Sequence, residues 1–118
     1  MNLEEIESCV INAFKKLDAS YLYVLDNDFT YSNLDKEGII QDLKFKIDQI
    51  KSKNLFDLKV LPSKCIFCYP QANAYQFVNL NNGELVIRIV IAQESINEFR
   101  IEECKNNPIP EADDGLPF

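Results

Sequence analysis

Apolar residues recur every three or four positions along the first part of the chain. They stand at Leu3, Ile6, Val10, Phe14 and Leu17. This spacing places them on one face of an α-helix, so we expect a helix from Asn2 to about Leu17. Asn2 and Glu5 have the spacing of a capping box, in which each side chain binds the other residue's backbone N–H. The first element is therefore predicted to be an amphipathic helix.

A second apolar stripe predicts a longer helix from about Lys36 to Lys53. Its members are Ile39, Ile40, Leu43, Ile47 and Ile50, which share one helical face. Asn54 suits the end of that helix, because asparagine tolerates the left-handed backbone conformation. Between the two helices we expect a short helical turn from Ser20, a break at residues 26–28 and a brief strand from Phe29 to Tyr31.

From Leu55 onward the apolar period changes to two, which is typical of β-strands. We expect strands at residues 55–60, 65–69, 75–80, 84–92 and 98–104, joined by turns at 70–73, 81–83 and 93–97. Asn81-Asn82-Gly83 is a hairpin signal, because Asn and Gly accept positive φ angles. The strand at 84–92 is apolar on both faces apart from Arg88, so we expect it in the middle of the sheet.

These elements predict an α+β fold, in which two long helices pack on an antiparallel sheet with four main C-terminal strands. The length of 118 residues fits one domain, which we place at residues 1–104. Residues 105–118 form a Pro-rich acidic tail. Its composition favours a solvated segment. The alternative is an arm that docks through Ile109, Leu116 and Phe118.

The formal net charge of −7 argues against nucleic acid or an anionic membrane surface as a partner. Lysines such as Lys44, Lys46, Lys51 and Lys53 fit solvated helix faces. No apolar run is long enough for a membrane span, and the acidic start MNLEEIESC is unlike a signal peptide. We therefore expect a cytoplasmic protein. The chain contains no histidine, which excludes Ser-His-Asp, Cys-His and His-ligated metal mechanisms.

The segment CIFCYP, residues 65–70, contains two cysteines at the C-x-x-C spacing of many zinc and redox sites. In an extended strand, positions i and i+3 point to opposite faces, so Cys65 and Cys68 would not share a metal ion. The Tyr-Pro pair that follows does not open a helix that would activate a redox thiol. We therefore expect no metal and no cofactor. The alternative is a four-thiol site completed in space by Cys9 and Cys104.

Three groups of residues are candidates for a ligand site. Arg88 is a cation within an apolar strand, and it must reach water, a carboxylate or a ligand because burying an unpaired charge is costly. Asp26, Asp28 and Tyr31 stand together at an irregular join, where turn formation is the alternative explanation. Tyr75 flanks a predicted turn, where it could line the rim of a pocket. No catalytic residue can be named, since no nucleophile, base and orienting group are recognisable together.

Two helices, a short strand region and four antiparallel strands in a chain of this size resemble the nuclear transport factor two-like superfamily. The segment DNDFTYSNLDKEGIIQDL is similar to the short strand, loop and helix opening of SnoaL-like members, and ELVIRIVIA to their long central strand. The lysine-rich second helix also resembles small uncharacterised bacterial members. The resemblance implies a cone formed by a curved sheet around a long helix, homodimers formed through the sheet, and a small apolar ligand inside. No catalytic motif of the family is matched.

Two functional hypotheses follow. The first is a small-molecule-binding cone domain for an apolar or anionic ligand, in which Arg88 anchors the ligand and Asp26 or Asp28 supplies any acid-base chemistry. The second is a non-enzymatic interaction module, either a dimeric adaptor or an immunity-type protein that binds a basic partner through its negative charge. Binding is favoured slightly over catalysis.

Overall fold

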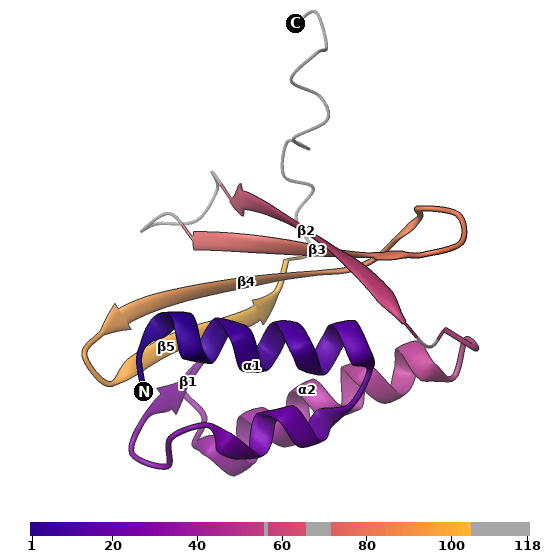
Figure 1. The fold of residues 1–118 in the computed structure, drawn as a ribbon. Coiled ribbons are helices and arrows are strands. Elements are labelled where there is room, and N and C mark those ends of the chain that lie inside the picture. The colour runs from indigo at the N-terminus through magenta and orange to yellow at the C-terminus, as the bar shows by residue number, and fades with distance from the viewer. Residues whose placement is uncertain (56, 66–71, 105–118) are drawn as a thin grey trace, which may run out of the picture.

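The computed structural model describes residues 1–55, 57–65 and 72–104. Within these residues the fold is α+β, with all helices on one side of a five-stranded sheet (Figure 1). The elements in chain order are α1 (Leu3–Lys16), the 3-10 helix η1 (Ala19–Val24), β1 (Thr30–Tyr31), α2 (Lys36–Lys51), β2 (Leu58–Cys65), β3 (Ala72–Asn79), β4 (Leu85–Ser95) and β5 (Glu98–Glu103). The predicted α+β class is confirmed.

Helix α1 begins and ends through local interactions. The Asn2 side chain accepts the Glu5 N–H at 2.9 Å, and the Glu5 carboxylate accepts the Asn2 N–H at 2.8 Å, which confirms the predicted capping box. At the other end, Leu17 adopts a left-handed conformation with φ 53°, and its N–H binds the Phe14 carbonyl at 3.3 Å. This residue turns the chain, so that η1 packs against both α1 and α2.

Helix α2 starts at its predicted residue and stops slightly early. Asp35 caps the helix, since its carboxylate accepts the Gly38 N–H at 2.8 Å. The helix ends at Lys51 rather than at the predicted Lys53, because Ser52 forms the C-cap. Asn54 has φ 62°, which confirms the predicted left-handed conformation after the helix.

The sheet is mixed, with strand order β1-β5-β4-β3-β2. Strands β2 to β5 form an antiparallel meander. β1 pairs in parallel with β5, where the Thr30 N–H binds the Asn97 carbonyl at 3.0 Å and the Ser32 N–H binds the Phe99 carbonyl at 2.7 Å. The prediction of a wholly antiparallel sheet was wrong at this edge, because no hairpin turn joins β1 to β5 and fixes an antiparallel direction.

The predicted strand at 55–60 has different bounds in the structure, where β2 runs without interruption from Leu58 to Cys65. Pro62 lies within it, although proline cannot donate a hydrogen bond to a ladder. β2 is the edge strand of the sheet, so one side of its backbone needs no partner and the proline is tolerated. Of the separate strand predicted at 65–69, Cys65 belongs to β2, and residues 66–69 lie outside the described residues.

The hairpin predicted at residues 81–83 is confirmed between β3 and β4. The Asn79 N–H binds the Glu84 carbonyl at 2.9 Å, and the Gly83 N–H binds the Asn79 carbonyl at 2.8 Å. Gly83 has φ 73°, a conformation that costs glycine little and other residues more. The Asn-Asn-Gly segment therefore predicted the hairpin correctly, because Gly83 adopts the positive φ angle at little cost.

Two other predicted turns have different bounds. The turn predicted at 70–73 overlaps β3, since Ala72 and Asn73 pair with β2. The turn predicted at 93–97 is shorter, because β4 continues to Ser95 before the chain reverses. The side chains at 93–95 are exposed, so their polarity reflects contact with solvent rather than a change of backbone direction. The apolar pattern therefore stops at Ala92, whereas strand β4 continues to Ser95.

The main core lies between the helices and the sheet. Helix α1 contacts β2, β3 and β4, whereas α2 contacts η1 and β1. The bulkiest core side chains include Phe14, Tyr31, Phe77 and Phe99, none more than 1% exposed. We call the opposite side of the sheet the outer face. A second, smaller buried cluster lies there, formed by Ala74, Val90 and Ala92.

Candidate functional site

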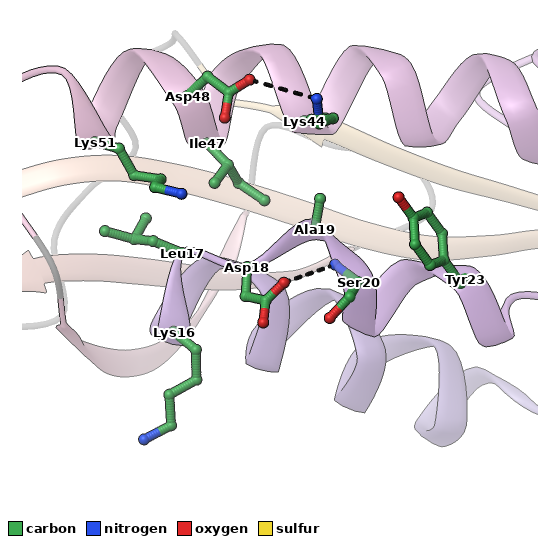
Figure 2. Close-up of a pocket in the computed structure, with 10 residues that line it drawn as sticks. All are labelled: Lys16, Leu17, Asp18, Ala19, Ser20, Tyr23, Lys44, Ile47, Asp48 and Lys51. Carbon is green, nitrogen blue, oxygen red and sulfur yellow. Dashed lines mark hydrogen bonds and ion pairs between the residues drawn. The ribbon is translucent and has the colours of Figure 1, made fainter.

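A surface cleft of about 580 Å³ lies where the chain leaves α1 and passes α2 (Figure 2). The left-handed Leu17 turns the chain, and the Asp18 carboxylate then accepts the Ser20 N–H at 2.9 Å, which caps η1. These local interactions position η1 beside α2, with the cleft between them. Its volume is within the range of about 300 to 1,000 Å³ that small-molecule sites occupy.

The cleft has an apolar floor and a polar rim. Leu17 and Ile47 are almost fully buried beneath it, at 3% and 1% exposure, and Ala19 lies beside them. The polar side chains that line it are Lys16, Asp18, Ser20, Tyr23, Lys44, Asp48 and Lys51. Figure 2 shows Tyr23 pointing from η1 toward α2, and Lys16 extending away from α2. Lys16 therefore lies at the outer edge.

The charged groups in the cleft differ in how they are paired. Lys44 and Asp48 form an ion pair of 3.9 Å with both side chains 56% exposed, a geometry that contributes little. Hydrogen bonds from Ser20 lower the pKa of Asp18, and the positive charge of Lys51 lowers it further. Lys51 forms no ion pair with any other described residue. Its ammonium group is therefore open to an anionic ligand.

The cleft continues along α2 into a second hollow of about 490 Å³. Tyr23 and Lys44 line both hollows. The Lys36 ammonium donates a hydrogen bond to the Tyr23 carbonyl, which ties α2 to η1. Both elements also expose large apolar side chains, with Tyr23 at 58% and Val24 at 65% on η1 and Phe45 at 63% on α2. The surface made by η1 and α2 is thus partly apolar as well as charged.

Of the predicted site residues, Asp26 and Asp28 lie in the segment between η1 and β1, and Tyr31 is the second residue of β1 itself. The Asp26 carboxylate accepts the Asp28 N–H at 2.9 Å, and the Tyr31 hydroxyl donates to the Asp26 carbonyl at 2.9 Å. Tyr31 is fully buried and stacks on Phe99 with ring centroids 6.1 Å apart. Burial raises the pKa of Tyr31 to about 12. These contacts fit the interpretation that Asp26 and Asp28 form a turn, and the Tyr31 hydroxyl ties this turn to β1.

Tyr75, the fourth predicted site residue, lies in a different cluster between β3 and α1. Its hydroxyl donates to the Glu7 carboxylate at 3.0 Å, and the Asn73 amide donates to the same oxygen at 2.7 Å. Glu7 is 9% exposed, so two donors from the sheet hold a nearly buried charge. Burial, and then the charge of Glu7, raise the pKa of Tyr75 to about 12. This cluster joins α1 to the sheet.

Arg88, the fifth predicted site residue, lies on the outer face of the sheet and is 8% exposed. Its neighbours Ile87 and Ile89 belong to the core beneath the helices. Because side chains alternate along a strand, Arg88 points to the opposite side. The structure therefore does not bring Arg88 together with Tyr75, which faces α1, or with the turn that contains Asp26.

The cysteines lie in separate places. Cys65 closes β2, and Cys68 lies outside the described residues. Cys9 packs against the helix-side core, whereas Cys104 packs on the outer face, so these two thiols do not complete one site. Burial raises the pKa of Cys9, which disfavours its reactive thiolate form. Among the described residues, no group of three or more His, Cys, Asp or Glu side chains is arranged to hold a metal ion.

The sequence patterns did not single out the residues that form the cleft. Lys44 and Lys51 were expected on a solvated helix face, yet their spacing of two turns places them on the same side of α2. Glu7 was also missed. It lies one turn from Leu3 and one turn from Val10, so it shares the edge of the apolar stripe, and a carboxylate at such a position needs partners. Both signals were present in the sequence.

No family model matches the chain, and no curated protein or solved structure matches it significantly. The resemblance to the nuclear transport factor two-like superfamily therefore stays a prediction drawn from sequence pattern. In the part of the chain that the structure describes, no helix combines the length and the apolarity needed to cross a membrane.

Proposed function

We propose that this protein binds a small anionic molecule with an apolar body in the cleft between η1 and α2. The observation that carries the proposal is the position of Lys51, which has no ion pair among the described residues and lines a cleft above the buried Leu17 and Ile47. A carboxylate or phosphate group would accept hydrogen bonds from the ammonium. The apolar part of the ligand would cover the floor and the ring of Tyr23.

The carboxylates of the cleft support binding rather than catalysis. Asp18 accepts hydrogen bonds that lower its pKa, so it is a weak base and a poor proton donor near neutral pH. Asp48 is paired with Lys44 on the next turn of α2. A carboxylate with a lowered pKa, such as Asp18, does not suit acid-base catalysis at neutral pH. The cleft is therefore suited to hold a ligand and has no evident means to transform it.

The test compares two probes of equal chain length, hexanoate and hexanol, titrated into the full-length protein while backbone amide shifts are recorded. Hexanoate should shift the amides around Leu17, Ser20 and Lys51 to saturation, and hexanol should shift them much less. Lys51→Gln should weaken hexanoate binding about fivefold, because an exposed hydrogen bond to a charged group contributes roughly 1 kcal/mol. Lys59→Gln, which removes an exposed lysine on β2, should leave the affinity unchanged.

Two outcomes would reject this assignment. The first is an equal response to hexanoate and hexanol, which would mean that the cleft does not recognise the anionic group. The second is an unchanged affinity for hexanoate in Lys51→Gln, provided that the variant keeps the circular dichroism spectrum of the parent protein. Either result would remove the role of Lys51.

A protein-interaction module is the second candidate function. It is supported by the large apolar side chains that η1 and α2 expose, namely Tyr21, Tyr23, Val24 and Phe45, since such patches often mark interfaces. Sedimentation equilibrium tests whether a second copy covers the patch. Self-association should then be lost in Val24→Ser with Phe45→Ser, and kept in Ile96→Ser, where the side chain is 81% exposed in the β4–β5 turn. A monomer at all concentrations would reject this dimer.

The cone-like curvature of the sheet and the family assignment are also part of the proposal. A short strand lies between the two long helices, four strands follow, and the helices lie on one side of the sheet, an arrangement that supports the expected cone-like curvature. The same order fits the resemblance to SnoaL-like proteins, and we keep the homodimer through the sheet and the cytoplasmic location as part of the proposal. The family assignment is tested by comparing the sheet curvature in a crystal structure of this protein with that of SnoaL-like structures.

A further inference from the structure

A second pocket, of about 310 Å³, lies between α1 and Tyr75 of β3. Its lining residues on α1 recur every three or four positions, so they share one face of the helix. They are Glu4, Glu7, Ser8, Ile11 and Asn12. The pocket is separate from the cleft between η1 and α2, because the two have no lining residue in common. We call it the Glu7 pocket.

Glu7 brings a nearly buried negative charge to this pocket. It is only 9% exposed, and it lies beyond the first turn of α1, where the helix dipole has little effect on a carboxylate. Its two printed partners, the Asn73 amide and the Tyr75 hydroxyl, are neutral donors. No described residue forms an ion pair with Glu7. A buried charge is costly without a partner of opposite sign, so the pocket favours a positively charged ligand.

The second oxygen of the Glu7 carboxylate can accept hydrogen bonds from such a ligand. Both donors from the sheet bind Oε2, and no described residue donates to Oε1. Because Asn73 and Tyr75 hold Oε2, they also fix the orientation of the carboxylate. Glu4 adds an exposed carboxylate one turn earlier. Its place in the first turn of α1 is explained by the helix dipole, so the argument depends on Glu7.

The acceptors of the Glu7 pocket fit an organic ammonium group better than a metal ion. A primary ammonium has three N–H donors, which the carboxylates of Glu7 and Glu4 and the hydroxyl of Ser8 could accept. A calcium ion takes about six to eight oxygen ligands. Among residues 1–55, 57–65 and 72–104, no group of three or more His, Cys, Asp or Glu side chains is arranged to hold a metal ion. Ile11 and the ring of Tyr75 add apolar surface for an alkyl chain.

We propose that the Glu7 pocket binds a small primary amine in its protonated form. The ammonium group lies between Glu7 and Glu4, and the alkyl chain packs against Ile11 and Tyr75. This site goes beyond the anion cleft proposed above and does not depend on it. The ligand supplies a positive partner for Glu7, so its binding should also stabilise the folded state.

The test titrates hexylammonium and hexanol, which have equal chain lengths, into the full-length protein at neutral pH while backbone amide shifts are recorded. Hexylammonium should shift the amides of Ser8, Asn12 and Tyr75 to saturation, and hexanol should shift them much less. Glu7→Gln should weaken hexylammonium binding about tenfold, because it removes a nearly buried charged acceptor. Glu4→Gln should weaken it about threefold, since exposed charges contribute less.

The matched control is Glu84→Gln, which removes one exposed negative charge in the β3–β4 hairpin, outside the Glu7 pocket. It should leave the affinity for hexylammonium unchanged. If Glu7→Gln prevents folding, Glu4→Gln decides the test, because Glu4 is exposed and its replacement leaves the core intact. Calcium chloride is titrated in parallel and should not shift the amides of Ser8, Asn12 and Tyr75.

Three results would overturn the proposal. The first is an equal response to hexylammonium and hexanol, which would mean that the pocket does not recognise positive charge. The second is an unchanged affinity for hexylammonium in the glutamine variants at positions 7 and 4 that keep the circular dichroism spectrum of the parent protein. The third is a calcium titration that shifts the same amides to saturation, which would mean an inorganic cation site.

Discussion

The contact between Tyr75 and Glu7 allows a quantitative test of how α1 is held on the sheet. Glu7 is 9% exposed, and one of its oxygens accepts the Tyr75 hydroxyl at 3.0 Å and the Asn73 amide at 2.7 Å. Tyr75→Phe removes one of these donors and keeps the ring. The Glu7 carboxylate then stays nearly buried, and of its two donors only the Asn73 amide remains. We therefore expect the folded state to lose stability, with no change in topology.

The size of the effect follows from the charge of the acceptor. A hydrogen bond to a charged group contributes about 1.5 to 3 kcal/mol, compared with roughly 1 kcal/mol for a neutral pair. We expect Tyr75→Phe to lower the free energy of unfolding by about 2 kcal/mol. In a Glu7→Gln background, where the acceptor is neutral, the same substitution should cost only about 1 kcal/mol. The difference of about 1 kcal/mol is the coupling energy between positions 7 and 75.

Urea denaturation followed by circular dichroism measures these values. The matched control is Tyr21→Phe, because Tyr21 is 40% exposed on η1 and should change stability by less than about 0.5 kcal/mol. The denaturant slope should be the same in all variants, which would show that the denatured state is unchanged. A loss below about 0.5 kcal/mol for Tyr75→Phe, or equal losses in the parent protein and in the Glu7→Gln background, would refute the view that this bond anchors α1.

Three further predictions concern pH and the two backbone signals. Folding raises the pKa of Tyr31 and Tyr75 from 10.0 to about 12, so the unfolded chain loses these protons first. We measure the free energy of unfolding in urea at increasing pH. The two phenols should leave it unchanged below pH 10, and each should lower it by about 1 kcal/mol per pH unit between pH 10 and 12. A free energy that stays constant between pH 10 and 12 would contradict both pKa shifts. Asn2→Ala should lower the free energy of unfolding by about 1 kcal/mol, because α1 loses its N-terminal cap. An unchanged thermal unfolding transition would mean that the first turn of α1 is already frayed in the parent protein. Gly83→Ala should cost about 1 kcal/mol in urea denaturation, because φ is 73° although nothing lies within 4 Å of the added Cβ; a neutral result would mean that the hairpin adjusts.

The helices were predictable because their signals are local. The capping box at Asn2, the apolar stripe of α2 and the left-handed Asn54 each depend on a few neighbouring residues, and the predicted helix ends fall within two residues of the observed ones. The strands depend on partners far along the chain. Pro62 is tolerated only because β2 is an edge strand, and the parallel pairing of β1 depends on β5. The alternation of apolar and polar residues within a strand predicts neither its position at the sheet edge nor the direction of its partner strand.

The site residues were harder to predict, because alternation shows that a strand has two faces but not which face the helices cover. Arg88 stood out as a cation in an apolar strand, yet only the packing of α1 on β3 and β4 places it on the outer face. The cleft depends on the left-handed turn at Leu17, and leucine rarely adopts that conformation. Glu7 meets Asn73 and Tyr75 from 66 and 68 positions away, so its place at the edge of the apolar stripe indicates that it needs partners but not which residues they are.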